Sequence, residues 1–362
     1  MENSKQIQKA GDDAQQIQAE SVTVNNGFSA NDVANIFKAL VPMSIQDYTK
    51  EAYRIAEERI TCFENKLLPR IEEIENAIPM FADPVFQVQL KNAQRSAAVS
   101  DRKEDYGLLT ELIIAHVEKG ANRKNRIGIQ KATEIVGMID NDALCALTVA
   151  HAIGSFAPMQ GTAKEGLQNL NQLFTRLIYE KLPEGVDWID HLDVLGTIRI
   201  NAFGSMKKIS EYYTKTLNGY ACIGIEKQSD NYKRALDLLA NIKLSQEVLI
   251  NNPFLDGYVC LPIFNKNAIH NMELVNANRT RNLNEKEVNA LYSIWDMYDT
   301  DDQLQDEVNK KFMDMWDSFE SLRTVRVWWE DISRGFSITS VGKVLAHTNA
   351  KRCDKRVPDL IE

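Results

Sequence analysis

Alternating polar and apolar positions predict a set of very short β-strands in the first 27 residues. Residues 6–8 read Gln-Ile-Gln and recur at residues 16–18, so each copy places one β-branched side chain between two glutamines. A turn signal, Gly-Asp-Asp at residues 11–13, separates the copies. Val-Thr-Val at residues 22–24 has high β propensity and ends at a second turn cluster. The pattern predicts a small β-arch or β-roll.

This N-terminal stretch has too few apolar side chains to form a core of its own. An isolated hairpin is marginal in water, whereas stacked copies of one segment pair their backbones and their glutamine amides in ladders. We therefore expect the stretch to join copies of the chain or to add strands to a partner protein. A polar tail without fixed structure is the open alternative. The expected interface residues are Gln6, Ile7, Gln8, Gln16, Ile17, Gln18, Val22 and Val24.

Helical spacing of apolar residues begins at Ser29 and continues for most of the chain. Ser29 with Asp32 resembles a capping box. Pro42 is expected to end the first helix, and Pro69 is expected to begin a new one. Further helices are predicted over residues 44–67, 85–99, 106–117, 127–139, 142–153, 162–182, 187–217 and 229–250. Short polar joints between them predict a mostly α protein with a multi-helical body over residues 28–255.

A different pattern starts near residue 256, where residues 257–264 read as a strand between turn residues. Residues 324–329 alternate like a second strand, so Trp328 and Trp329 are expected on opposite faces. A third strand is predicted at residues 336–338, and Thr339 then caps a terminal helix. This order predicts a small winged-helix-like α+β module over residues 256–362, an analogy of fold that does not fix function.

Composition narrows the classes of function. The chain has 362 residues, 44% of them hydrophobic and 26% charged, with a net charge of -9. The negative charge disfavours a general binder of nucleic acid or of anionic membranes. The five cysteines form no C-x-x-C pair, and the sequence shows neither a secretory signal nor an apolar run long enough to span a bilayer. We expect a cytoplasmic protein with no cofactor and no membrane contact.

An acidic segment holds the one candidate metal site. On a helix, Asp187, Asp190 and His191 share a face. The favoured interpretation is an acidic helix start, since carboxylates stabilise the positive end of the helix dipole. The histidines His116, His151, His270 and His347 lack metal-binding spacing and are expected to be packed or exposed. No catalytic residue is identified.

Two basic segments are candidates for contact with a nucleic-acid backbone. The first is a predicted loop holding Lys119, Arg123, Lys124 and Arg126. The second follows the terminal helix and holds Lys351, Arg352, Lys355 and Arg356. Cations also stabilise the negative end of a helix, and charged loops are commonly solvated, which is the favoured interpretation.

The stretch GDDAQQIQA, the helical body and the terminal FSITSVGKVLA together resemble an uncharacterised family of bacterial proteins. Members share G-D-x-x-x-Q-I-Q-A near the start and F-x-L-T-x-x-G-x-x-[LI]-A at the end. Here Asp13-Ala14 replaces a more open Asn-Ser, and Ile338 stands where Leu is usual. The resemblance implies no activity and no catalytic residues. It implies a bacterial cytoplasmic protein, of the accessory or antiphage-defence kind.

These observations favour a non-enzymatic protein that forms homo-oligomers or docks on a protein partner through residues 4–26. One alternative is a nucleic-acid-associated regulator that uses the winged-helix-like module. The other is a metal-dependent enzyme centred on Asp187, Asp190 and His191.

Overall fold

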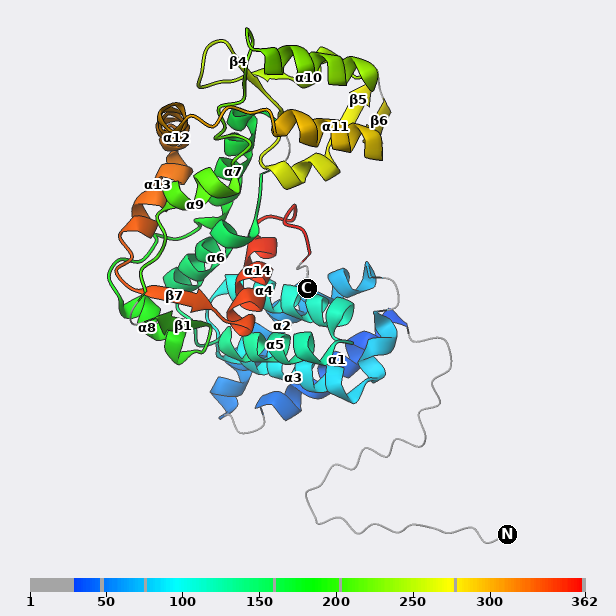
Figure 1. Cartoon of the computed structure of the whole chain (residues 1–362). Coiled ribbons are helices and arrows are strands. Elements are labelled where there is room, and N and C mark those ends of the chain that lie inside the picture. The colour runs from blue at the N-terminus through cyan, green and yellow to red at the C-terminus, as the bar shows by residue number, and fades with distance from the viewer. Residues whose placement is uncertain are drawn as a thin grey trace.

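The computed structural model describes residues 29–45, 49–74, 77–158, 161–201, 204–276 and 279–359. It is mostly helical with a few small antiparallel strands, as the sequence predicts (Figure 1). The predicted N-terminal strands and their eight interface residues lie outside the described residues. Within those ranges, no helix is long and apolar enough to cross a membrane.

Five helices form one end of the molecule (Figure 1). They are α1 (Ala30–Ile45), α2 (Lys50–Glu72), α3 (Pro84–Val99), α4 (Lys103–Lys119) and α5 (Arg123–Ile135), with the short helix η1 (Ile78–Ala82) before α3. In α2 the buried residues follow helical spacing from Ala56 through Ile60, Phe63 and Leu67 to Ile71. This stripe packs α2 against α3 and α4.

Two proline predictions are wrong. Pro42 lies inside α1, which continues to Ile45, and Pro69 lies near the end of α2 rather than at a helix start. Both are within the last turn or so of a helix. A proline removes one backbone hydrogen bond there, and packing of the apolar face outweighs that loss.

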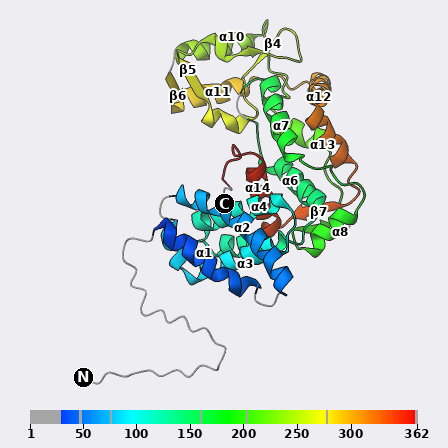
Figure 2. The ribbon, with the colours of Figure 1, turned by 180° about the vertical axis from the view of Figure 1, so that it is seen from behind.

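The terminal helix α14 (Ser340–Cys353) lies at the centre of the helical body (Figures 1 and 2). It contacts α4 and α5, and it also contacts α6 (Asn141–Ser155) and α7 (Ala163–Leu177). The last helix of the chain therefore joins the N-terminal helices to the middle of the chain.

Residues 187–217, predicted as helix, contain a strand. They form α8 (Asp187–Val194), β1 (Ile198–Asn201) and α9 (Ile209–Thr216). Strand β1 pairs antiparallel with β7 (Gly335–Ile338), with Ile198 opposite Ile338. The predicted strand at the C-terminus and the Thr339-capped helix are thus confirmed, and the partner strand of β7 comes from the middle of the chain.

The strand predicted at residues 324–329 is wrong, because these residues lie in helix α13 (Glu320–Glu330). Leu322, Val325, Trp328 and Trp329 are all buried there, a helical stripe rather than an alternating one. Both tryptophans donate ring hydrogen bonds to backbone oxygens, Trp328 to Pro183 at 3.0 Å and Trp329 to Lys207 at 2.8 Å. Helix α12 (Asp302–Asp317) precedes α13.

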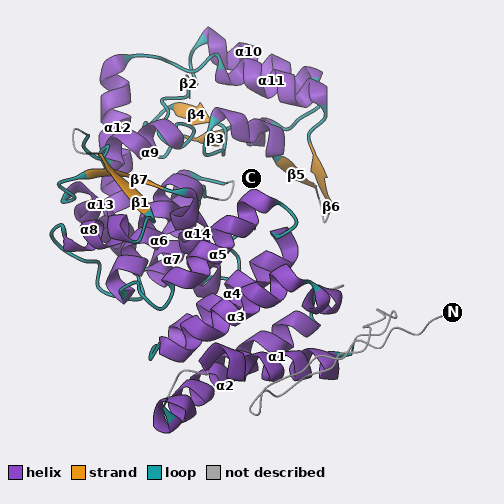
Figure 3. Ribbon diagram, turned by 90° about the horizontal axis from the view of Figure 1, so that it is seen from below, coloured by secondary structure: helices purple, strands orange, loops and turns teal. Residues whose placement is uncertain are grey.

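A second apolar cluster lies at the far end from α1 (Figures 1 and 3). Its strands are β2 (Ile225–Glu226), β3 (Ile250–Asn251) and β4 (Tyr258–Cys260), in the antiparallel order β2-β4-β3. Strand β4 confirms the strand predicted after residue 256. The other elements are α10 (Asp230–Asn241), η2 (Gln246–Val248), η3 (Lys266–Asn271), β5 (Glu273–Asn276), β6 (Arg279–Asn282) and α11 (Glu285–Trp295).

The two apolar clusters have different boundaries along the chain from the predicted modules. The residues of the second cluster lie between Ile225 and Ile294. Within that range Phe254 and Leu255 belong to the main cluster, which continues from Val308. Residues 308–357 therefore pack on the helical body, whereas strands β2 and β4 belong to the smaller cluster. The module boundary at residue 256 stays a prediction.

Candidate functional site

The C-terminal sequence motif positions α14. Phe336 packs its ring against Trp188, with centroids 5.8 Å apart. Thr339 accepts a hydrogen bond from Gly342 N at 3.1 Å and donates toward the carbonyls of Gly196 and Thr197. A Cβ atom on Gly342 would lie 2.0 Å from Thr197 O, so only glycine fits. The motif docks the terminal helix onto the turn before β1.

A chain of hydrogen bonds runs through two buried histidines. Ser155 Oγ lies 3.1 Å from His151 Nδ1, His151 Nε2 lies 3.3 Å from His347 Nδ1, and His347 Nε2 lies 2.8 Å from Pro358 O. The carbonyl can only accept, so His347 Nε2 donates to it. His151 Nε2 then donates to His347, and Ser155 donates to His151. Both rings are neutral in this arrangement.

Burial favours the neutral state of both rings. It lowers the pKa of His151 to about 4, with further contributions from His347 and Lys343. Burial also lowers the pKa of His347, although its hydrogen bond to Pro358 acts in the opposite direction. At neutral pH this series of hydrogen bonds therefore holds the C-terminal segment against α6 and α14.

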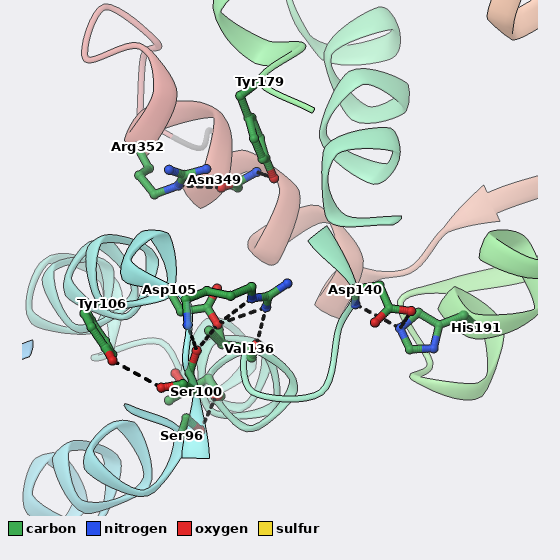
Figure 4. Close-up of polar contacts among 12 residues, drawn as sticks. Ser96, Ser100, Asp105, Tyr106, Val136, Asp140, Tyr179, His191, Asn349 and Arg352 are labelled. Atoms are coloured by element: carbon green, nitrogen blue, oxygen red, sulfur yellow. Dashed lines mark hydrogen bonds and ion pairs between the residues drawn. The ribbon is translucent and has the colours of Figure 1, made fainter. Parts of the chain in front are cut away.

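Asn349, two residues along α14, carries a second buried contact (Figure 4). Its amide donates to Thr148 Oγ1 at 2.8 Å and to Tyr179 OH at 3.1 Å, and its oxygen accepts from Arg352 Nε at 2.7 Å. The Arg352 guanidinium also lies 4.9 Å from the Tyr179 ring centroid. This contact ties α14 to α6 and to the segment after α7.

Asp105 organises the junction of α3, α4 and α5 (Figure 4). Its carboxylate accepts from Ser100 Oγ at 2.5 Å and from Arg102 Nε at 3.0 Å, while Arg102 also donates to Val136 O at 3.1 Å. Burial raises the pKa of Asp105, although Ser100 and Arg102 act against it. These contacts hold α3, α4 and α5 together.

The structure brings the two predicted basic segments toward one place. Lys119 ends α4, Lys351 lies in the last turn of α14, and both line a cavity of about 70 Å³ between α4, α5 and α14. A hydrogen bond from Lys351 lowers the pKa of Asp359, and the charge of Lys119 adds to this effect. Lys351 therefore pairs with this carboxylate, and the charge of Lys119 acts on it as well.

Carboxylates of the chain pair with Lys355 and Arg356 of the second segment. Lys355 and Arg70 both donate to the buried Glu111, Arg70 at 2.6 Å. Arg356 pairs with Asp354 at 2.8 Å. The predicted loop is also partly helical, since Arg123, Lys124 and Arg126 lie in α5. Arg123 and Lys124 of the first segment are exposed, as are Lys355 and Arg356 of the second, which pair with carboxylates.

The candidate metal ligands contact different parts of the chain. Asp190 pairs with Arg334 at 2.8 Å, and His191 Nε2 accepts a hydrogen bond from Asp140 N at 3.1 Å (Figure 4 shows the latter). Asp187 lines an open cleft with Glu180. Within the described ranges, no three His, Cys, Asp or Glu side chains are placed to hold a metal ion.

A cleft of about 680 Å³ lies at the junction of the two apolar clusters, lined by residues of α9, α11 and α12. The Asn252 side chain stabilises this junction by hydrogen bonds to the backbone. Its amide donates to Cys222 O and Ile223 O, both at 2.8 Å, and its oxygen accepts from Phe254 N at 2.8 Å and Leu255 N at 3.2 Å.

The fold and these contacts define the chain as a mostly helical protein built around a buried C-terminal helix. A protein-family model matches residues 27–360, and the chain belongs to that family. The family is uncharacterised, and no activity is assigned to it. Neither the curated proteins nor the solved structures include a match.

Sequence reasoning missed the residues that hold the body together. His151 with His347, and Glu111 with Lys355, are far apart in the chain and close in space. Each pairing depends on where α14 docks. The C-terminal motif was the available signal, because a helix with a cap, a close-packed glycine and buried Leu345 and Ala346 must lie in a core.

Proposed function

We propose that this protein is an assembly or docking protein, in which residues 4–26 join copies of the chain or bind a partner and the helical body is the unit they carry. The observation that carries the proposal is the repeated Gln-Ile-Gln triplet, whose few apolar residues need strands from another chain to form a sheet. The family match begins at residue 27, which supports treating the repeat as a segment distinct from the body.

The contacts of the body also support this proposal. The buried Asp105, Glu111, His151 and Asn349 all hydrogen-bond between helices or between a helix and an adjoining segment. Buried polar networks of this kind rigidify a fold. A rigid body suits a protein whose role is to be held in an assembly.

Light scattering of the full-length protein beside a truncated variant beginning at Phe28 tests the proposal. A defined oligomer for the full chain and a monomer for the truncated variant are expected. The full-length double variant Ile7→Asp/Ile17→Asp should also dissociate, since a buried unpaired carboxylate opposes strand stacking. The matched control Lys5→Asn/Lys9→Asn changes charge beside the repeat and should assemble normally.

Equal masses for the full-length and truncated proteins would reject self-assembly. Docking on another protein would then require that immobilised residues 1–27 capture a defined partner and that the Ile7→Asp/Ile17→Asp sequence fails to do so. If neither assembly nor capture depends on the two isoleucines, the proposal fails.

A second candidate function is contact with a nucleic-acid backbone. The observation that favours it is the approach of the two basic segments, in the first of which Arg123 and Lys124 are exposed. Fluorescence anisotropy with random duplex DNA at low salt should then show binding that Arg123→Ala/Lys124→Ala weakens. The matched control, Lys227→Ala/Lys233→Ala, removes two exposed lysines from the smaller cluster. Equal affinity of the two variants would remove this candidate.

The defence role implied by the family resemblance forms part of the proposal. Phage plating on bacteria that express the full-length protein, compared with bacteria that express Ile7→Asp/Ile17→Asp, tests whether assembly and protection occur together. Protection by both proteins would separate defence from assembly.

A further inference from the structure

Two buried cysteines meet where the chain passes from the main apolar cluster to the smaller one. Cys222 is 6% exposed and Cys260 is 4% exposed. Cys222 precedes β2, and Cys260 ends β4. The Cys222 thiol donates to Gly219 O at 3.1 Å, and Cys260 lies close enough to raise the pKa of Cys222.

The backbone on both sides holds the two thiols together. Strand β4 pairs with β2 on one side and with β3 on the other. Gly224, at φ +81°, brings its backbone against β4, where an added Cβ would lie 3.3 Å from Cys260 Cβ. The Asn252 amide holds Cys222 O at 2.8 Å. The backbone that carries both cysteines is therefore fixed by these contacts.

We propose that Cys222 and Cys260 are a modification site, a thiol pair that hydroperoxides oxidise to a disulfide joining the smaller cluster to the helical body. Cys222 lines the cleft of about 680 Å³ at the junction, which gives a small oxidant a path to its thiol. Cys260 is buried and does not line the cleft, and it acts as the resolving thiol.

The reaction has two steps. The Cys222 thiol loses its proton, and its sulfur attacks one oxygen of the hydroperoxide. The O–O bond breaks, giving a sulfenic acid and an alcohol that takes up a proton. The Cys260 thiol then attacks the sulfenic sulfur, the S–S bond forms, and water leaves with the proton. Two thiols lose two electrons, and the hydroperoxide is reduced to an alcohol and water.

The environment of Cys222 sets the expected rate. The hydrogen bond with Cys260 and then burial raise the pKa of Cys222 well above its ordinary value. Because the thiolate is the nucleophile, oxidation is slow near neutral pH and becomes faster as the pH rises. The disulfide should thus form slowly and stabilise the junction for a long time, which does not suit a rapid signal.

Hydrogen peroxide treatment of the full-length protein tests the site. Intact mass spectrometry is expected to show a loss of about 2 Da, the two thiol hydrogens, reversed by dithiothreitol. Peptide mapping without reduction should link Cys222 to Cys260. Cys222→Ser and Cys260→Ser should each abolish this link, whereas the matched control Cys62→Ser, which removes an exposed thiol, should retain it.

Thermal unfolding supplies the second readout. The link closes a long loop, so the oxidised protein should unfold about 5 °C or more above the reduced protein. A mapped disulfide between other cysteines, or thiols at Cys222 and Cys260 that survive peroxide at alkaline pH in the folded protein, would overturn the proposal. Since the wild-type chain carries the mapping experiment, the result does not depend on whether a serine variant folds.

Discussion

Gly342 in the first turn of α14 lies against the backbone carbonyl of Thr197, and a Cβ atom at residue 342 would lie 2.0 Å from that oxygen. The contact joins the terminal helix to the turn before β1. Thr339, which caps the same helix, hydrogen-bonds toward the same carbonyl at 3.0 Å. The docking of α14 therefore depends on the absence of one side chain.

Gly342→Ala should destabilise the fold by about 3 kcal/mol, because the methyl group meets backbone atoms that cannot rotate away. Urea unfolding monitored by tryptophan fluorescence measures the change. Gly154→Ala is the matched control, since no heavy atom lies within 4 Å of its added Cβ. Alanine favours a helix over glycine, so the control should be neutral or more stable by up to about 1 kcal/mol. Equal stability of the two variants would contradict the close contact.

The sequence predicts this end of the chain well because its signals are local. A cap at Thr339 and a strand before it can be recognised from neighbouring residues, and the structure confirms both. The helix α13 was predicted as a strand because Val-Arg-Val alternates over three positions only. The buried stripe of Leu322, Val325 and Trp329 shows the longer helical period that decides the structure.

The candidate sites could be predicted less well because their partners are distant in sequence. Asp190 and His191 are neighbours on α8, but each contacts a different part of the chain, Asp190 pairing with Arg334 and His191 accepting from Asp140 N. Similarly, Lys355 looks like part of an exposed basic segment until α14 docks beside Glu111. Spacing along one helix predicts a shared face, and only tertiary packing determines what that face contacts.

Glu111 should be important for stability because it is 4% exposed and accepts from two cations, Arg70 and Lys355. Glu111→Gln removes the counter-charge of Lys355 and the closer counter-charge of Arg70, which also lies 3.6 Å from Glu73. It should cost about 2 kcal/mol, reduced from fully buried values because both cations reach solvent. The neighbouring exposed Glu118→Gln should change stability by less than about 0.5 kcal/mol. Urea unfolding at neutral pH measures both.

The contribution of Glu111 should also depend on pH. Burial alone would raise its pKa, but hydrogen bonds from Lys355 and Arg70 outweigh burial, and the net pKa is lowered from 4.5. The stabilisation is therefore present above the unfolded pKa and is lost as pH falls through the folded pKa. The difference between wild type and Glu111→Gln should shrink on acidification. A difference that grows would show that the charge is not what Glu111 contributes.

On acidification, the buried histidines should begin to reduce the stability of the fold at a higher pH than the carboxylates do. The pKa of His151 is about 4 in the fold against 6.5 in the unfolded chain. Between these values the unfolded state binds more protons, so stability rises with pH and is lost as pH falls from 6.5 toward 4. The loss due to His151 is about 3 kcal/mol. His347, with Lys343, Lys119, Lys351 and Asp359 around the pair, titrates in the same direction.

His151→Gln should flatten this pH dependence, measured as the free energy of unfolding at several pH values between about 4 and 7. Ser155→Ala, which removes the exposed end of the hydrogen-bond chain and keeps both rings, should retain most of it. If His151→Gln and wild type lose stability in parallel, His151 is not held neutral by burial.

Asn252 should determine whether the two apolar clusters unfold together. Its side chain satisfies four backbone groups at the junction, the carbonyls of Cys222 and Ile223 and the amides of Phe254 and Leu255. Asn252→Ala leaves these buried groups unpaired and should cost about 3 kcal/mol. Asn252→Asp keeps the acceptor, loses both donors and places a carboxylate against two carbonyl oxygens, so it should cost at least as much.

Hydrogen exchange measured by mass spectrometry distinguishes local from global effects. In Asn252→Ala the strands β2 and β4 and helix α10 should exchange faster, while α4 and α14 keep their protection, because the two clusters have separate cores. Asn251→Ala changes the exposed neighbouring side chain and should leave both patterns unchanged. Equal acceleration in both clusters would mean that the molecule unfolds as one unit and that Asn252 stabilises it globally, whereas wild-type exchange would show that the four hydrogen bonds do not hold the junction.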